Sequence, residues 1–322
     1  WASPGGSSGG ASAAVMSGMG SLAHGNDIAG SLRIPSTATG ACTVKPGLGR
    51  VPAYNPSQTQ ERGLVAQLMS VQGVIAREIK DVRLGMQSLI NYDPRDPWMV
   101  DMPFESKEIQ LPIKIGFTKE TLGESLHPAI NKALENAIDA LKDAGYILEE
   151  IALPEFEDAA NFSAKTLFGE IKALHEKDYK KLGSENFNLV AENYFEIISP
   201  FEGEDLLLGM AKRSYFLREW NLFFRKYPLV LTPFLLYPTY KWNRDTEGLE
   251  GTKEVLAGMF YAHTMNYMGI PAGVISANYN DGLPIGVQII SSRFREDIIL
   301  KACEEIETRI GIMAIKLFER GQ

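Results

Sequence analysis

Two glycine-rich segments near the start of the chain carry serines in surroundings that suit a nucleophile. Residues 5–10 read GGSSGG, and residues 28–31 read IAGS, which ends in Ser31. The first segment matches the G-x-S-x-G pattern of α/β-hydrolases with either Ser7 or Ser8 at its centre. That pattern requires a buried apolar strand before the serine, whereas the sequence WASP, with its proline, precedes it here. We therefore set aside an α/β-hydrolase nucleophile.

A catalytic triad of His24, Asp27 and Ser31 also fits poorly. The members of such a triad converge from separate parts of a fold, whereas these three residues are close neighbours in sequence. We interpret His24 as structural and expect a serine that is activated without histidine. Amide hydrolysis then needs a nucleophile, a route for its proton and donors for the developing oxyanion. Consecutive backbone N–H groups of small residues can form such a donor site. The predicted donors are the N–H groups of Ile28, Ala29, Gly30 and Ser31.

The rest of the chain has to position these serines, and its hydrophobic periodicity alternates between helices and strands. Helical patterns cover residues 78–90, 128–143, 155–182, 213–227, 252–268 and 296–309. Strand patterns cover residues 114–118, 146–151, 229–232, 272–276 and 284–290, and an Asn-Asp-Gly turn at 280–282 joins the last two as a hairpin. The chain shows neither an internal repeat nor a linker. We therefore predict a single α/β domain over residues 1–322.

Motifs spread over nearly the whole chain resemble the amidase signature hydrolases. In family order they are GGSSGG at 5–10, GNDIAGSLRIP at 25–35, KP at 45–46, GRVP at 49–52, GVIAR at 73–77, DPRDP at 93–97, LTP at 231–233, GIPA at 269–272 and GLPIGVQ at 282–288. The resemblance implies the amidase signature fold, a mixed β-sheet core with helices on both faces. It also implies hydrolysis of a non-peptide carboxylic acid amide to the acid and ammonia or an amine, through an acyl-serine and a Ser–cis-Ser–Lys triad. It implies neither a cofactor nor a metal.

Carried over residue by residue, the resemblance makes Ser31 the nucleophile. Ser7 becomes the serine after a cis peptide bond, which passes the proton. Ser8 would support it, and Asp27 and Arg33 would hold the nucleophile loop in shape through buried polar contacts.

The triad lysine of the family lies well upstream of GGSSGG, and the catalytic Lys is not in this chain. Lys45 matches the structural Lys-Pro position of the family, so we do not assign it the role of base. We expect the chain to lack the N-terminal portion of the family domain and, taken alone, to be hydrolytically inactive.

The motifs depart from the family pattern at two positions, and two other functions stay open. Ala29 replaces the first glycine of the common Gly-Gly-Ser, which costs about 1 kcal/mol if that position needs a positive φ. Asn26 replaces a usual threonine or serine. One alternative is the amidase (A) subunit of a tRNA-dependent glutamyl/aspartyl amidotransferase, which usually reads Arg-Gln-Pro where residues 33–35 read RIP. The other is a catalytically inactive amidase-like binding protein, against which the retention of Ser7 and Ser31 speaks.

The composition of the chain argues against some classes of binding partner. A net charge of −8 argues against nucleic acid, and no uncharged stretch is apolar enough to predict a membrane span. The two cysteines, Cys42 and Cys303, lack the spacing of a metal site and favour a reducing, cytoplasmic compartment. Aromatic residues between 215 and 227 suit core packing, and those between 234 and 242 suit a pocket for an apolar or aromatic acyl group. We expect a small-molecule amide as the substrate, and a homodimer stays open.

Overall fold

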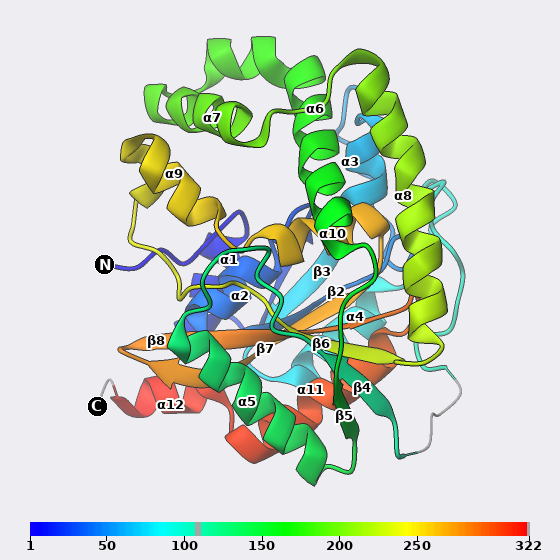
Figure 1. The fold of residues 1–322 in the computed structure, drawn as a ribbon, viewed down its shortest axis with the longest axis vertical. Coiled ribbons are helices and arrows are strands. Elements are labelled where there is room, and N and C mark those ends of the chain that lie inside the picture. Colours follow the sequence, from blue (N-terminus) through cyan, green and yellow to red (C-terminus); the bar gives the residue numbers. More distant parts are fainter. Residues whose placement is uncertain (107–110, 321–322) are drawn as a thin grey trace.

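The chain is built around one eight-stranded mixed β-sheet in the computed structural model, which describes residues 1–106 and 111–320. The strand order is β1-β3-β2-β7-β8-β6-β4-β5 (Figure 1). The strands are β1 (Leu22–Asp27), β2 (Cys42–Lys45), β3 (Val71–Ala76), β4 (Lys114–Phe117), β5 (Ile147–Glu150), β6 (Leu229–Pro233), β7 (Ala272–Asn280) and β8 (Leu283–Ser291). Strand β4 runs parallel to β5 and β6, and the other neighbours are antiparallel.

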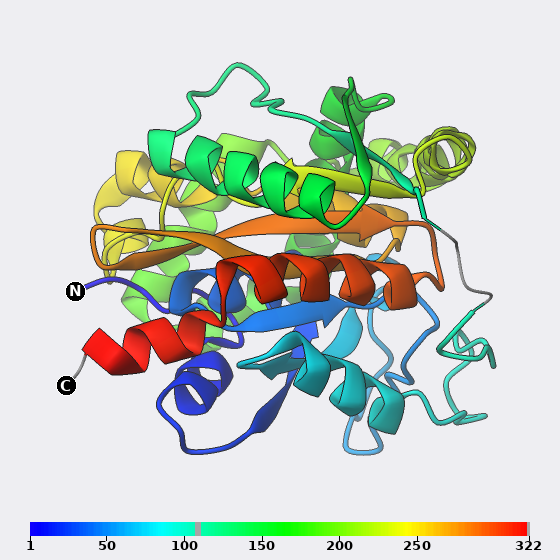
Figure 2. The same cartoon turned by 90° about the horizontal axis from the view of Figure 1, so that it is seen from below.

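Helices cover both faces of the sheet, as the predicted fold requires. One face carries α4 (Ile79–Leu89), α5 (Pro128–Asp143) and α11 (Glu296–Ile310), which lie in front of the strands in Figure 2. The other face carries α1 (Gly9–Met16), α2 (Arg33–Thr39), α3 (Leu64–Met69), α6 (Phe156–Leu182), α8 (Gly203–Phe224) and α10 (Phe260–Met268). The remaining elements are α7 (Glu185–Ile198), the short helix η1 (Arg244–Thr246), α9 (Gly248–Leu256) and α12 (Met313–Arg320).

Successive side chains of the central strands point to opposite faces of the sheet, and an apolar core lies on each face. Leu229 and Leu231 of β6 belong to the core under α5 and α11, whereas Val230 between them belongs to the core under α8 and α10. This follows from the two-residue period of a strand, which sends successive side chains to opposite faces. A strand buried on both faces is therefore mainly apolar, although β6 also buries Thr232.

Several predicted elements are confirmed closely. Helix α5 has the predicted bounds, and α4, α6 and α11 agree with their predictions within a residue or two. Strands β7 and β8 form the predicted antiparallel hairpin. Its turn contains Asp281 at φ 49° and Gly282 at φ 87°, two positive values in succession, as a type I′ turn needs.

Other predictions were wrong or incomplete. The helix expected over 252–268 is two helices, α9 and α10, separated near Gly258. Gly258 has φ +78°, and a Cβ there would lie 2.6 Å from the backbone nitrogen of Leu236. Helix α8 begins at Gly203 rather than at residue 213. Strands β1, β2 and β3 were not predicted, because a short sequence such as the LAHGND of β1 has no regular apolar alternation.

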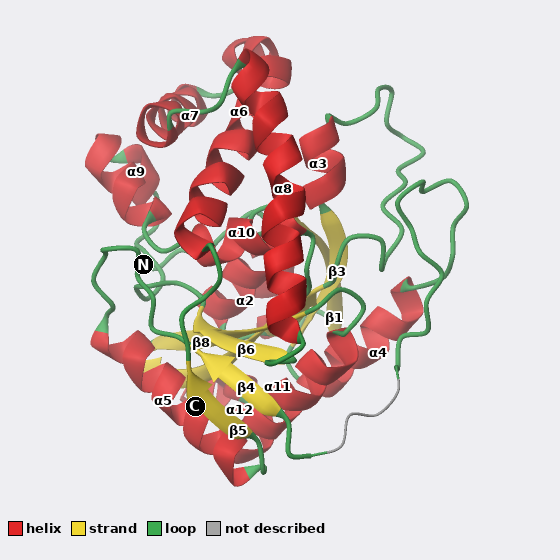
Figure 3. Ribbon diagram, turned by 45° about the vertical axis from the view of Figure 1, so that its right-hand side comes forward, coloured by secondary structure: helices red, strands yellow, loops and turns green. Residues whose placement is uncertain are grey.

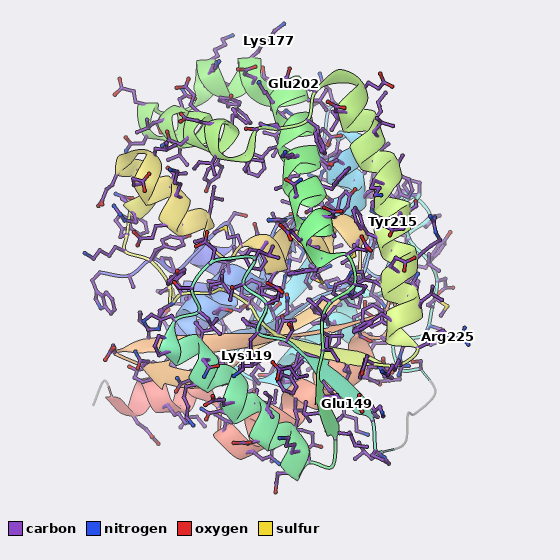
Figure 4. All side chains as sticks on the ribbon, in the orientation of Figure 1. Lys119, Glu149, Lys177, Glu202, Tyr215 and Arg225 are labelled. Carbon is purple, nitrogen blue, oxygen red and sulfur yellow. The ribbon has the colours of Figure 1, made fainter. Side chains whose placement is uncertain are left out.

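Helices α6, α7 and α8 form an excursion away from the sheet. Lys177 of α6 and Glu202, just before α8, are labelled at its far end in Figure 4, whereas Glu149 of β5 lies at the opposite side of the molecule. The near half of α6 packs on α10 and thereby contributes to the surroundings of the nucleophile loop.

Candidate active site

The two glycine-rich serine segments meet in space, as predicted. The backbone nitrogen of Ser8 donates to the carbonyl oxygen of Ser31 at 3.1 Å, and the Ser8 hydroxyl donates to the carbonyl oxygen of Asn26 at 3.4 Å. The Gly6–Ser7 peptide bond is cis, which confirms that expectation. Ser8 therefore joins the start of α1 to the end of β1.

The hydroxyls of Ser7 and Ser31 are not directly linked in the described structure. Ser7 is exposed and Ser31 is half-buried. Within residues 1–106 and 111–320, no hydrogen bond joins their hydroxyls, so the expected direct proton path is not formed in this conformation. Catalytic hydrogen bonds are often long before substrate binds, so the proton-transfer role of Ser7 stays a prediction.

Asp27 braces the nucleophile loop from beneath. Its carboxylate accepts from the backbone nitrogens of Gly30 at 2.7 Å and Leu32 at 3.2 Å, on either side of Ser31. Arg33 donates to the same carboxylate from Nε at 2.9 Å and Nη2 at 3.0 Å. Burial alone raises the pKa of Asp27, but the charge and hydrogen bonds of Arg33 outweigh it and hold the pKa below its usual range. The brace is therefore ionised.

Arg33 extends this brace to helix α10 and strand β8. It is completely buried and donates to Gln288 Oε1 at 2.7 Å, to the Ala262 carbonyl at 2.9 Å and to Asn266 Oδ1. Asn266 in turn donates to the backbone carbonyls of Asp27 at 2.8 Å and Met69 at 3.0 Å. The expected supporting roles of Asp27 and Arg33 thus have their contacts in the structure.

The oxyanion loop departs from expectation at one donor. The N–H of Gly30 donates to Asp27, so only the N–H groups of Ile28, Ala29 and Ser31 remain predicted oxyanion donors. Ala29 does not adopt a positive φ. The left-handed region falls instead on Gly30, at φ +114°, where a Cβ would lie 2.9 Å from that of Ala262. The departure at Ala29 therefore causes no backbone strain.

Lys45 is buried in β2 beside this network. Its Nζ donates to the Pro46 carbonyl at 3.0 Å, and it makes no hydrogen bond to Ser7 or Ser31 among the residues described. Burial lowers the pKa of Lys45 to about 7, and the charge of Arg33 acts in the same direction. The geometry agrees with a structural role for this lysine.

The triad set aside above is absent from this site. His24 lies exposed on β1, and both oxygens of Asp27 are engaged by Arg33 and the loop. A different histidine, His263 of α10, lies next to Ala262, which packs against Gly30. Sequence reasoning missed His263, because α10 also carries Thr264 and Asn266 and no local pattern distinguishes the histidine from these polar residues.

His263 is held by a serine from the helical excursion. Its Nδ1 lies 2.9 Å from the hydroxyl of Ser163 in α6, and its side chain is half-buried. Burial, together with the nearby charge of Arg33, lowers the pKa of His263 to about 4. The imidazole is therefore neutral near pH 7 and can exchange hydrogen bonds through its second nitrogen.

The aromatic stretch agrees only in part with the prediction, because Phe234, expected to suit a pocket, is buried in the core and Trp242 is exposed. Phe216, Trp220 and Phe224 of α8 are buried in the core. Tyr237 and Tyr240 instead line a pocket of about 610 Å³ between the 235–241 segment and α9, whose rim carries charged residues. The Tyr240 carbonyl accepts from the nitrogen of Ser3, so this pocket adjoins the chain that leads to Ser7.

No group of three potential metal ligands occurs among the described residues, and no helix there is long and apolar enough to cross a membrane. Cys42 and Cys303 are both free and buried.

Comparisons with known proteins identify a family and similar proteins. The family model described as Amidase matches residues 2–300. Indoleacetamide hydrolase of Bradyrhizobium diazoefficiens is 38% identical over 98% of this chain and 60% of the relative. That of Bradyrhizobium japonicum is 37% identical over 98% of this chain and 68% of the relative. The A subunit of the glutamyl-tRNA(Gln) amidotransferase of Methanosarcina mazei is less similar, at 28% identity over 94% of this chain and 67% of the relative.

Solved structures show the same fold at lower identity. A bacterial aryl acylamidase of the amidase signature family superposes with a TM-score of 0.73 at 24% identity, covering 95% of this chain and 66% of that one. The 6-aminohexanoate cyclic dimer hydrolase gives a TM-score of 0.80 at 23% identity, covering 96% and 68%. The chain thus spans about two thirds of the length of its relatives. With the braced serine loop and the family match over residues 2–300, it belongs to the amidase signature family.

Proposed function

We propose that the protein hydrolyses a carboxylic acid amide at its C–N bond through an acyl intermediate on Ser31. The observation that carries this proposal is the junction of the two serine segments, where Ser8 binds Ser31 above a loop braced by Asp27 and Arg33. A rigid loop of this kind holds backbone donors where charge develops during acyl transfer.

The reaction proceeds in two balanced steps. Ser31 Oγ attacks the amide carbonyl, and its proton passes through Ser7 to a base and then to the leaving nitrogen, so that ammonia or an amine departs. Water then attacks the acyl-Ser31 ester, which releases the acid and restores the hydroxyl. The N–H groups of Ile28, Ala29 and Ser31 stabilise the oxyanion in both steps. The base is a lysine outside residues 1–322, as the family resemblance implies.

An aromatic acyl group is the substrate class that the surroundings favour. Tyr237 and Tyr240 line the pocket beside the chain that leads to Ser7. The similar proteins named above act on indoleacetamide and, for one solved structure, on aryl acylamides. The free cysteines Cys42 and Cys303 support a cytoplasmic location.

Ammonia release from phenylacetamide by the longer protein, without any partner, tests the proposal. Ser31→Ala should lower kcat/KM by roughly four orders of magnitude or more, and Ser7→Ala by roughly two to four. Ser17→Ala is the matched control, because Ser17 is exposed and its hydroxyl contacts only its own helix. Activity that survives Ser31→Ala would reject Ser31 as the nucleophile. No ammonia release by the longer protein would favour a binding protein, and release only with a partner protein would favour one component of an amidotransferase.

The position of the base has its own test. Residues 1–322 and the longer protein are each treated with a fluorophosphonate, and the rate at which Ser31 displaces fluoride to form a phosphonyl-serine is measured. The proposal expects labelling of the longer protein only. Equal labelling of both, abolished by Lys45→Met, would instead make Lys45 the base.

A further inference from the structure

A second cavity in the described part of the chain is distinct from the pocket of Tyr237 and Tyr240. It has a volume of about 660 Å³ and is formed by segment 48–62, the end of α3 with Ser70 and Val71, and segment 94–98. We call it the Arg62 crevice. The loops that form it run side by side at the right of Figure 3. Its size is that of a small-molecule site, and none of the expected catalytic or oxyanion residues lines it.

Arg62 brings unused hydrogen-bond donors to this crevice. Its half-buried guanidinium donates once, from Nη1 to Ser70 Oγ at 3.0 Å, and forms no ion pair within residues 1–106 and 111–320. The neighbouring Arg95, which also lines the crevice, is by contrast paired with Asp93 through Nε and Nη2 and lies over the Tyr54 ring at 4.7 Å from its centroid. A guanidinium has five donors arranged to grip a carboxylate in a fork. Arg62 therefore has most of its donors available.

An aromatic wall is fixed beside Arg62. Trp98 donates from Nε1 to Gln67 Oε1 at 3.0 Å, and Gln67 Nε2 donates to the Arg62 carbonyl at 2.7 Å. One glutamine thus orients the indole relative to the backbone of Arg62. The rings of Trp98 and Tyr54 remain 38% and 46% exposed. Exposed aromatic rings in a concave site suit a flat apolar ligand.

The two carboxylates that line the crevice do not neutralise Arg62. Asp96 accepts from the backbone nitrogens of Ala53 at 2.7 Å and Trp98 at 2.8 Å, so each of its carboxylate oxygens is hydrogen-bonded to the backbone of a loop. Glu61 is exposed at the rim and forms no ion pair in the described chain.

Positive charge also lies behind the crevice wall at Leu48. Arg293 donates from Nη2 to the Leu48 carbonyl at 2.7 Å. Arg213 lies on the same side, because a Cβ on Gly269 would meet both its Nη2 and the Leu48 Cβ. Neither arginine forms an ion pair among the residues described. The surroundings therefore favour an anion.

We propose that the Arg62 crevice binds a small aromatic carboxylate, with Arg62 gripping the carboxylate and Trp98 and Tyr54 flanking the ring. Such a ligand lies close to the nucleophile loop, since Ser70 Oγ accepts from both Arg62 and Asn26 Nδ2, the latter at 2.8 Å. Asn26 directly precedes Asp27 in β1. The acid released by an aromatic amidase has the same chemistry. This last link rests on the proposed function, but the binding itself does not require turnover.

Fluorine NMR on the chain labelled with 5-fluorotryptophan tests this site directly. The chain has four tryptophans, which give separate reporters, and the probe is phenylacetate. We expect the Trp98 signal, assigned by Trp98→Phe, to shift saturably, while that of the buried Trp220 stays in place. Acetate lacks the ring and 2-phenylethanol lacks the charge, so each should bind roughly tenfold more weakly or worse.

Matched arginine variants complete the test. Arg62→Gln should weaken phenylacetate binding by roughly tenfold or more, and Arg62→Lys should restore part of the loss. Arg225→Gln is the control and should leave binding unchanged, because Arg225 is exposed and does not line the crevice. Shifts confined to Trp1 or Trp242, affinity that is unaffected by Arg62→Gln, or no saturable binding would each overturn the proposal. Because no hydrolysis is measured, these outcomes are independent of the test of Ser31.

Discussion

Arg33 and Arg62 both connect to the end of strand β1, yet their surroundings differ sharply. Arg33 contacts Asp27 directly, and Arg62 is linked to the neighbouring Asn26 through Ser70. Arg33 is completely buried and donates to Asp27, Gln288, Asn266 and the Ala262 carbonyl. Arg62 is half-buried and donates once, to Ser70 Oγ, which also accepts from Asn26. Since successive side chains of a strand point to opposite faces, Asp27 and Asn26 direct their partners to opposite sides of β1.

The difference separates a brace from a binding group. A guanidinium whose donors are all satisfied by protein has no capacity for a ligand, and it holds its partners in place. A guanidinium with free donors beside a cavity retains the capacity to bind an anion. Burial and hydrogen-bond count, rather than residue type, assign Arg33 to the nucleophile loop and Arg62 to the crevice.

The largest expected difference between the two arginines is in their contribution to the free energy of unfolding. Arg33→Gln removes one partner of a buried ion pair and leaves the Asp27 charge uncompensated, so the free energy of unfolding should fall by roughly 3–5 kcal/mol. Arg62→Gln, at a half-exposed site without an ion pair in the described chain, should change it by less than about 1 kcal/mol. Urea unfolding of both variants measures the contrast, and losses of similar size would refute the distinction.

Lys45 provides a third case for comparison with Arg33 and Arg62. It is a buried basic residue that forms no ion pair among the described residues. Its pKa is about 7 in the folded protein against an ordinary 10.5. Between these values the unfolded chain binds a proton that the folded chain does not, so stability should rise with pH, by at most about 1.4 kcal/mol per pH unit. Below pH 7 the contribution should level off.

Lys45→Met keeps the volume of the side chain and should remove this rise. Urea unfolding of wild type and variant between pH 7 and 9.5 isolates the effect, because other titrating groups are common to both proteins. Parallel stability curves would mean that Lys45 stays protonated in the folded state.

The smallest effect concerns Ser163, which holds His263 next to the nucleophile loop. Ser163→Ala removes one neutral hydrogen bond, worth about 0.5–1.5 kcal/mol, and should lower kcat/KM of the longer protein by roughly three- to tenfold. The pH profile above pH 5 should keep its shape, because the pKa of His263 is already lowered to about 4. His175→Gln, at an exposed position of α6, is the control. A new ionisation near pH 6.5 would show that burial does not keep His263 neutral.

Local signals predicted the fold where one element could be recognised by itself. The period of α5 and the Asn-Asp-Gly turn of the β7–β8 hairpin are properties of a few consecutive residues. The prediction of one helix over 252–268 was wrong because the break at Gly258 depends on a close contact with Leu236, which is distant in sequence. A local pattern carries no information about such a contact. Likewise β1 is a strand because β3 pairs with it, not because its own sequence alternates.

The sequence by itself determined the family, the fold class and the two serine segments, because a motif conveys residue type and order along the chain. Tertiary structure alone decided which polar groups are satisfied. Arg33 donates to Gln288, which lies 255 positions away in the sequence. Arg62 donates to Ser70 at the end of α3, and no carboxylate among the residues described pairs with it. Burial and the geometry of donors depend on segments distant in sequence, so they distinguish the brace from the binding group only once the chain has folded.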